Sequence, residues 1–225
     1  MTKPLSVGII MDGNRRWAST KGVSSVGGHK AGFTALTDLL KEYVSLKKEY
    51  GIEHYVFYAF STENWNRSKE EVTALMALLK SGLSKIEEEL QKLEEAPRIS
   101  FVGDLARFDE GIQKEMKDIE ERTKDNEGTV ALALSYGGRD EIVRAIQKGA
   151  EVSEEGISSA LDTAGIPDPD IIIRTGGEKR LSNFLLWQAA YSEFFFIDTF
   201  WPDFSKDTLI GCVTEYNTRE RRHGV

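Results

Sequence analysis

Short apolar runs alternate along the chain with longer segments in which apolar residues recur every three or four positions. The runs predict six strands, at residues 5–10, 54–60, 99–102, 129–136, 170–174 and 193–197. The longer segments predict helices at 30–48, 68–93, 105–124, 139–148, 153–162 and 207–220. Strands that are apolar at consecutive positions and alternate with helices predict a mainly parallel six-stranded sheet flanked by helices on both faces.

The predicted parallel sheet also indicates where a ligand binds. In open parallel sheets, ligands bind at the carboxyl ends of the strands. Five loops rich in Gly, Arg, Asn and Ser follow predicted strands, at 12–17, 61–67, 103–104, 137–139 and 175–182. We therefore expect these loops to form one site on one rim of the sheet. The helix after the second loop begins with Ser68-Lys69-Glu70-Glu71, a capping box in which Glu71 reaches back to the N-cap.

Composition limits the classes of protein that remain. The chain has 225 residues, of which 40% are hydrophobic, and we expect residues 1–225 to form a single domain. Its net charge of −8 argues against nucleic acid as a partner. The single cysteine, Cys212, allows no internal disulfide, and neither a signal peptide nor a membrane-spanning run is visible. A cytoplasmic protein is expected, at most peripheral to the membrane.

The first loop combines a carboxylate with phosphate-binding groups. Asp12 is able to hold a hard cation such as Mg²⁺, and Asn14 and Arg16 are able to bind phosphate oxygens. Gly13 allows the backbone to approach a ligand closely. The alternative is an ordinary strand-to-helix turn with solvated charges. His29 falls near a predicted helix start, where an anion site and a simple surface histidine are both open.

The other two polar loops suggest further phosphate contacts. In the second, Ser61 and Asn64 offer neutral hydrogen bonds, Arg67 is a bidentate anion binder, and Trp65 is either a wall of the site or part of the core. In the third, Arg174 ends a strand of three isoleucines, where a charge needs a partner. Arg180 and Ser182 lie two positions apart, as an extended segment requires to aim both side chains one way. Surface ion pairs are the alternative for this loop.

The absence of several known motifs argues against several kinds of chemistry. The sequence has no Cys/His cluster with zinc spacing, no Gly-x-Ser-x-Gly elbow and no Walker-type loop. Arginines in two groups, one or two carboxylates for Mg²⁺ and abundant aromatic residues suit two phosphorylated substrates with apolar tails. Glu193, beside the run 194–197, needs a cation or an arginine as its partner.

Several long motifs in the chain resemble one family. Segments 11–18, 28–32, 58–67, 174–178, 181–188 and 201–204 are similar to the cis-prenyltransferases, the undecaprenyl or polyprenyl diphosphate synthases also called isoprenyl transferases. The resemblance runs from about residue 5 to the C-terminus, with archaeal-like features. It implies a homodimer with an apolar tunnel. It also implies Mg²⁺-dependent addition of isopentenyl diphosphate to farnesyl or geranylgeranyl diphosphate, giving a Z-polyprenyl diphosphate used as a lipid carrier for glycan assembly.

The resemblance also assigns roles to residues of this chain. Asp12 and Asn64 are the implied catalytic residues, and Asp12 and Glu193 the implied Mg²⁺ ligands. The implied substrate-binding residues are Gly13, Asn14, Arg15, Arg16, Trp17, His29, Ser61, Thr62, Glu63, Trp65, Arg67, Arg174, Arg180, Leu181, Ser182, Arg222 and Gly224. The Arg-x-Gly ending implies a site completed across the dimer. Release of the product implies a transient contact with the membrane surface.

Three departures from the family pattern and two alternatives remain open. Arg15 replaces a glycine, Ser25 an arginine and Lys179 a histidine that are frequent in bacterial members. The candidate tunnel residues are Ala59, Leu75, Met76, Leu79, Leu83, Ile86, Phe101 and Leu134, and each is also an ordinary core residue in type. A noncatalytic subunit that activates a partner and a nucleotide-phosphate enzyme are the competing interpretations.

Overall fold

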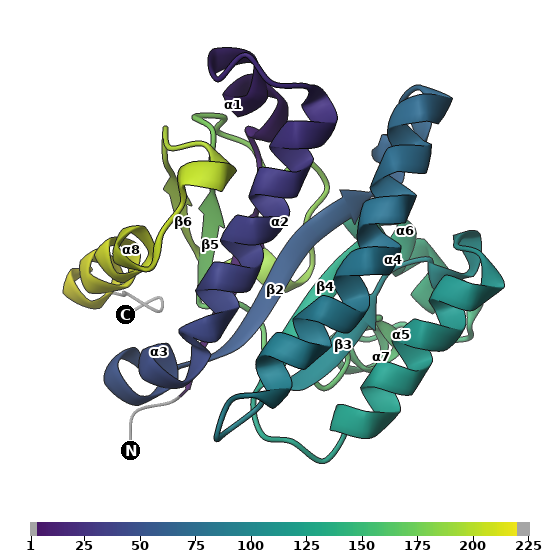
Figure 1. Ribbon diagram of the computed structural model, residues 1–225. Helices are drawn as coiled ribbons and strands as arrows, with labels where there is room; N and C mark the ends of the chain where they lie inside the picture. The colour runs from purple at the N-terminus through teal and green to yellow at the C-terminus, as the bar shows by residue number, and fades with distance from the viewer. Residues whose placement is uncertain (1–3, 220–225) are drawn as a thin grey trace.

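A six-stranded sheet in which all strands are parallel forms the centre of the molecule. The computed structural model describes residues 4–219. The strands are β1 (Leu5–Ile10), β2 (Ile52–Ser61), β3 (Arg98–Val102), β4 (Thr129–Tyr136), β5 (Ile171–Arg174) and β6 (Glu193–Phe196). They are ordered β3-β4-β2-β1-β5-β6, and every adjacent pair runs parallel (Figure 1). The predicted fold class is confirmed.

Eight α-helices and four short 3₁₀ helices connect the strands. The α-helices are α1 (Asn14–Thr20), α2 (Ser25–Lys41), α3 (Tyr43–Tyr50), α4 (Lys69–Gln91), α5 (Glu110–Thr123), α6 (Gly138–Gln147), α7 (Glu154–Ala160) and α8 (Lys206–Thr218). The 3₁₀ helices are η1 (Thr62–Asn66), η2 (Leu105–Arg107), η3 (Gln188–Tyr191) and η4 (Trp201–Asp203). These counts apply to residues 4–219 alone.

Two predicted helices are each divided in the structure. The segment predicted as one helix at 30–48 is α2 followed by α3, with a break at Glu42, whose carboxylate binds Lys206 at 2.9 Å. The break also lets Tyr43 enter the core and donate to the Glu53 carbonyl at 3.1 Å. The helix predicted at 105–124 starts later, because Asp109 caps α5 by accepting from the Ile112 amide. Helix α1 was not predicted.

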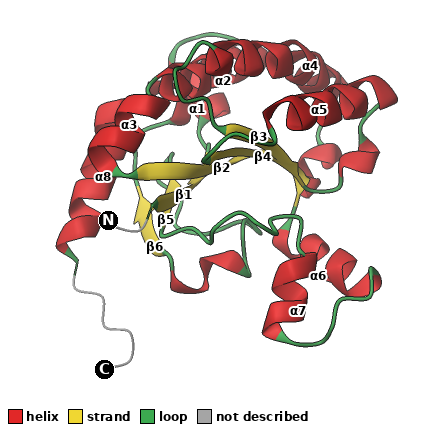
Figure 2. Cartoon of the chain, turned by 90° about the horizontal axis from the view of Figure 1, so that it is seen from below, coloured by secondary structure: helices red, strands yellow, loops and turns green. Residues whose placement is uncertain are grey.

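The two faces of the sheet are covered in different ways. Helices α2, α4 and α5 lie over one face, while α6 and α7 lie on the other side (Figure 2). On that second side, the residues that pack directly on the strands come from the segment between β5 and β6, with Phe184, Leu185 and, in η3, Ala189 all buried. Helices α6 and α7 form a small apolar cluster of their own around Ala145 and Ile157. Among the described residues, no helix is both long and apolar enough to span a bilayer.

Candidate active site

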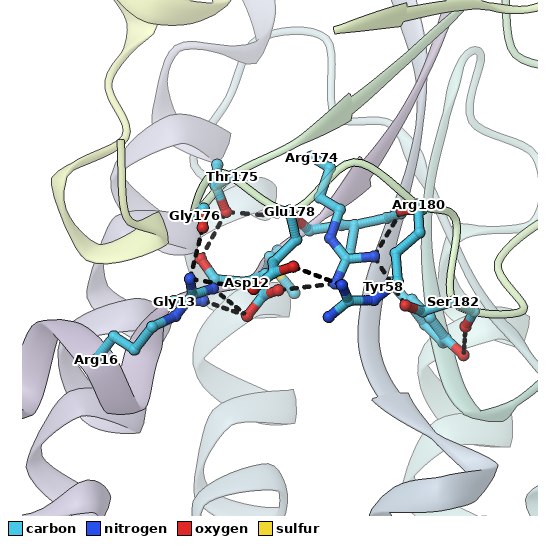
Figure 3. A network of polar contacts seen from close by, with 12 residues as sticks. Asp12, Gly13, Arg16, Tyr58, Arg174, Thr175, Gly176, Glu178, Arg180 and Ser182 are labelled. Carbon is cyan, nitrogen blue, oxygen red and sulfur yellow. Dashed lines mark hydrogen bonds and ion pairs between the residues drawn. The ribbon is translucent and has the colours of Figure 1, made fainter. Parts of the chain in front are cut away.

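Asp12 and Arg174 form the centre of a polar network at the carboxyl edge of the sheet (Figure 3). Arg174 is the last residue of β5 and pairs in register with Ile10 of the neighbouring β1, two positions before Asp12. Arg174 Nη2 donates to Asp12 Oδ2 at 2.8 Å, and the Arg174 side chain is only 4% exposed. The partner that a charge after three isoleucines requires is therefore Asp12.

Asp12 is held in its ionised form. Burial alone would raise its pKa, but the hydrogen bond from Arg174 and the charges of Arg174 and Arg16 outweigh burial, so the net shift of the pKa is downward. Asp12 Oδ1 also accepts from the Gly13 amide at 2.6 Å and lies 3.3 Å from Arg16 Nη2. Gly13 has a φ of 103°, and a Cβ there would collide with Phe200. A glycine is therefore required in this turn.

The third loop is folded back on Arg174 rather than extended. Arg174 Nη1 donates to the Arg180 carbonyl at 2.5 Å and to Ser182 Oγ at 2.8 Å. Ser182 has a φ of 49°, so the prediction of an extended segment at 180–182 is wrong. The Arg180 side chain pairs instead with Glu178, and Arg16 Nη1 donates to the Gly176 carbonyl at 2.7 Å. Leu181 is half-buried against the second apolar cluster.

The second loop is a capped 3₁₀ helix. The Asn64 side chain accepts from the Ser61 amide at 3.0 Å, and the Ser61 side chain accepts in return from the Asn64 amide. Trp65 is half-buried and packs edge-on to Phe60, with ring centres 4.9 Å apart. Its Nε1 donates to Ser135 Oγ at 3.0 Å. In this structure Trp65 thus belongs to the edge of the core.

A second cluster of charged residues lies between the second loop and α2. Arg67 Nη1 donates to Glu71 Oε1 at 2.9 Å, and His29 Nε2 lies 3.5 Å from both of these atoms. Burial and the charge of Arg67 lower the pKa of His29 below its usual value. Ser68 does cap α4 by accepting from the Glu71 amide, but the Glu71 carboxylate is turned to Arg67. The predicted reciprocal half of that capping box is therefore wrong.

Helix α1 brings one more polar group to the site. Asn14 begins α1, donates from Nδ2 to the Met11 carbonyl at 3.1 Å, and leaves its buried Oδ1 without a hydrogen-bond partner among the described residues. Arg15 is exposed, whereas the indole of Trp17 donates to Asp203 at 2.8 Å. Arg15 and Trp17 therefore lie outside the network around Asp12.

An apolar cavity of about 740 Å³, including the part open to solvent, has Asn14, His29 and Tyr58 among its lining residues. It lies between α2, α4 and the sheet. Seven of the predicted tunnel residues line it: Ala59, Leu75, Met76, Leu79, Leu83, Ile86 and Leu134. Phe101 is not among its lining residues and packs in the main core instead, so its predicted tunnel position is wrong. The register of β2 against β4 shifts between Tyr58 and Phe60, which leaves Ala59 exposed to this space.

Glu193 lies far from Asp12 in this chain. It is the first residue of β6 and is in register with Ile171, at the amino edge of the sheet, so the two predicted metal ligands sit at opposite edges. Glu193 Oε2 accepts from Arg219 Nη1 at 2.7 Å, which supplies the partner that its carboxylate needs. The predicted residues Arg222 and Gly224 lie outside the described residues.

The possible metal ligands among residues 4–219 suit a cation that takes part of its coordination shell from a bound substrate. These residues contain no group of three or more His, Cys, Asp or Glu side chains able to enclose a metal ion. Asp12 offers an ionised oxygen donor at 30% side-chain exposure. Mg²⁺ typically takes one or two carboxylates and completes its shell with substrate phosphates and water, so Asp12 fits such an ion.

Sequence reasoning missed four polar residues of this rim: Tyr58, Glu71, Glu178 and Asn183. Tyr58 donates to the carbonyls of Tyr136 at 3.1 Å and Ser182 at 3.3 Å. The capping pattern gave Glu71 another role, and the contacts of Glu178 and Asn183 join parts of the chain that no local pattern relates. For Glu178 and Asn183, the available signal was their position within the motifs at 174–178 and 181–188.

The fold places the chain among α/β proteins that bind ligands at the carboxyl edge of a parallel sheet. The family model described as "Putative undecaprenyl diphosphate synthase" matches residues 10–224. The chain belongs to this family, as its motifs predicted, and is a prenyltransferase of isoprenoid biosynthesis. The archaeal-like character stays a prediction.

Named relatives agree over almost the whole length. The isoprenyl transferase of Rhizobium meliloti (strain 1021) is 45% identical, with 98% of this chain and 92% of that protein covered. A Micrococcus luteus protein named ditrans,polycis-undecaprenyl-diphosphate synthase ((2E,6E)-farnesyl-diphosphate specific) is 41% identical over 98% of this chain and 91% of its own. The crystal structure of lavandulyl diphosphate synthase from Lavandula x intermedia, in complex with dimethylallyl diphosphate, has a TM-score of 0.90 at 34% identity and covers 99% of both chains.

Proposed function

We propose that this prenyltransferase condenses isopentenyl diphosphate with an allylic diphosphate, either farnesyl or geranylgeranyl diphosphate, to make a Z-polyprenyl diphosphate. The observation that carries the proposal is that the lining of the apolar cavity includes two residues of the polar site: His29, which lies beside Arg67, and Asn14, two residues after Asp12. A substrate with an anionic head and an apolar tail fits such a junction. The name of the Micrococcus luteus relative supports the substrate class.

The chain's residues divide between the two substrates. Arg16 and Arg67, with Gly13, Asn14, His29 and the loop at 61–67, bind the allylic diphosphate, while Arg174, Arg180 and Ser182 bind isopentenyl diphosphate. The bond from the allylic carbon to the diphosphate breaks, the isopentenyl double bond attacks that carbon, and the departed diphosphate accepts the proton that the isopentenyl unit loses; the resemblance assigns Asn64 to the handling of this proton. Fixed guanidinium groups stabilise the departing charge, which is the largest contribution expected in such a site.

Asp12 is the residue proposed to hold Mg²⁺. Its carboxylate is ionised and partly accessible, as a Mg²⁺ ligand must be. Mg²⁺, when bound, neutralises part of the diphosphate charge. Arg174 contacts Asp12 in the structure, so isopentenyl diphosphate competes with Asp12 for this guanidinium. Glu193 is able to join the same ion only from a second copy of the chain, because it lies at the other edge of its own sheet.

A homodimer is part of the proposal. Helix α6 exposes Val143 and Ile146 to about half of their area, at 51% and 52%, and Tyr191 at the end of η3 is 92% exposed. Val143 and Ile146 lie three positions apart on α6, so they are neighbours on one face of the helix and a candidate contact for a second copy. We further propose that the enzyme is cytoplasmic, contacts a membrane surface transiently to release its product, and supplies a lipid carrier for glycan assembly.

The deciding experiment is turnover by the purified chain alone. Isopentenyl diphosphate is supplied with dimethylallyl, farnesyl or geranylgeranyl diphosphate, with Mg²⁺ or with excess EDTA, and products are sized by chromatography. We expect elongation of farnesyl or geranylgeranyl diphosphate that EDTA abolishes. No product with any of these primers would refute the proposal and favour a noncatalytic subunit.

A further inference from the structure

Asn183 joins three loops of the rim through its backbone and side chain. Its Nδ2 donates to Glu63 Oε1 at 3.2 Å, in the loop after β2. Its Oδ1 accepts from the Arg139 amide at 2.9 Å, and its carbonyl accepts from the Gly138 amide at 2.7 Å, both at the start of α6. Asn183 itself belongs to the segment after β5. One residue therefore connects the carboxyl ends of three strands.

The surroundings of Asn183 are shaped for this residue. Its φ of 68° lies in the left-handed region, which asparagine tolerates better than most residues. A Cβ on Gly137 would lie 2.6 Å from Asn183 Nδ2 and 2.9 Å from Thr62 Oγ1. The glycine thus leaves the space in which the amide reaches Glu63. That hydrogen bond is also one of several that, against the effect of burial, lower the pKa of Glu63.

The residues on either side of Asn183 point in different directions: Ser182 toward Arg174 and Phe184 into the core. Ser182, also at positive φ, presents Oγ to Arg174 at 2.8 Å. Phe184 is fully buried and stacks on Tyr58, with ring centres 4.7 Å apart. Phe184 fixes the segment to the core, and Tyr58 donates to the Ser182 carbonyl at 3.3 Å, but neither contact holds the segment to the start of α6 or to the loop after β2. The bonds of Asn183 to Glu63 and to the start of α6 supply this further constraint on the direction of Ser182.

We propose that Asn183 is a positioning residue that holds Ser182 in place for Arg174, with the Glu63 carboxylate as its fixed partner. The proposal rests on the proposed function, because the predicted effect concerns isopentenyl diphosphate. Asn183 acts through Ser182 and Arg174. Loss of the amide frees Ser182 and weakens the binding of isopentenyl diphosphate more than that of the allylic substrate.

The first test is Asn183→Gly, because glycine retains the left-handed backbone and removes only the side-chain bonds. We expect the KM for isopentenyl diphosphate to rise about tenfold, the change that corresponds to about 1.4 kcal/mol. The kcat and the allylic KM should stay within about threefold. Asn126→Gly is the matched control, since Asn126 bonds the Pro97 carbonyl away from this rim, and it should behave like the wild type.

The second test separates positioning from a general effect on the fold. Asn183→Asp places a carboxylate against Glu63 and should raise the KM for isopentenyl diphosphate at least as much as Asn183→Gly. Adding Glu63→Gln places the amide of Gln, a donor, opposite the carboxylate of Asp at position 183. In this double variant the KM for isopentenyl diphosphate should be less than about threefold above that of Glu63→Gln alone. Melting temperatures of all variants are measured in parallel.

The outcomes distinguish this inference from the proposed function. A wild-type chain that makes no product contradicts the proposed function itself. An active wild type with an unchanged isopentenyl KM in Asn183→Gly overturns the role of Asn183. So does an equal rise of both KM values, or a penalty of Asn183→Asp that Glu63→Gln does not reduce.

Discussion

Replacing Asp12 with asparagine tests whether the pair with Arg174 stabilises the fold. Asparagine keeps an oxygen that is able to accept from Arg174 but removes the charge facing a guanidinium that is 4% exposed. Breaking a fully buried ion pair costs about 3–5 kcal/mol. Because Asp12 is 30% exposed and an acceptor remains, we expect roughly half of that, about 2 kcal/mol. For a chain of 225 residues this lowers Tm by about 4–8 °C.

The pH dependence of this loss has a defined sign. The folded pKa of Asp12 is lowered, so its contribution to stability is fully present above the unfolded value, near pH 4. That contribution disappears as the pH falls through the folded pKa. Urea unfolding of the wild type and Asp12→Asn should therefore differ most near pH 7 and converge below pH 4, over the range in which both are folded.

A matched control keeps the interpretation specific. Asp38 is 59% exposed and pairs with Lys41 on the surface of α2, so Asp38→Asn should change stability by less than about 0.5 kcal/mol. Equal or greater stability of Asp12→Asn at pH 7 would refute the reasoning. That result would mean that Asp12 is held at a cost to the fold by its neighbours.

Two further predictions concern the cavity and its charged mouth. Ala59→Leu should shorten the product, because Ala59 lines the cavity at the bulge of β2; product sizing with an unchanged length would remove it from the tunnel. Glu71→Gln should lower the pKa of His29 further, since Glu71 is the neighbour that raises it. A titration of the His29 ring protons by NMR measures this, and an unchanged or higher pKa would contradict it.

The sheet could be predicted from the sequence because its strands are continuous apolar runs of ordinary length. Ile171, Ile172 and Ile173, for instance, are all buried, so their hydrophobicity alone marks β5. Helix boundaries were less accurate: at the break between α2 and α3, Glu42 pairs with Lys206, which lies far along the chain. A local pattern contains no information about such a contact.

The candidate site was predicted as a set of loops but not as a set of contacts. The rule for parallel sheets brought residues 12 and 174 to one edge, and Asp12 and Arg174 do meet there. Ser182 and Asn183 have positive φ values, so the segment that was expected to be extended at 180–182 is folded back instead. Glu193 was grouped with Asp12 by family resemblance, although the predicted strand at 193–197 of a parallel sheet already places Glu193 at the amino edge, and the register of β6 confirms this.

The cavity under α4 has a consequence for how tightly the enzyme holds an apolar chain. Its walls include Leu83, Ile86 and Leu132, which are also members of the main core. A guest in this space completes the packing of the core and is retained by the same burial of apolar surface, about 25 cal/mol per Å², that folds the protein. Under the proposed function, each added isoprene unit would bury more apolar surface in this space, so we expect the release of the product to slow as its chain lengthens.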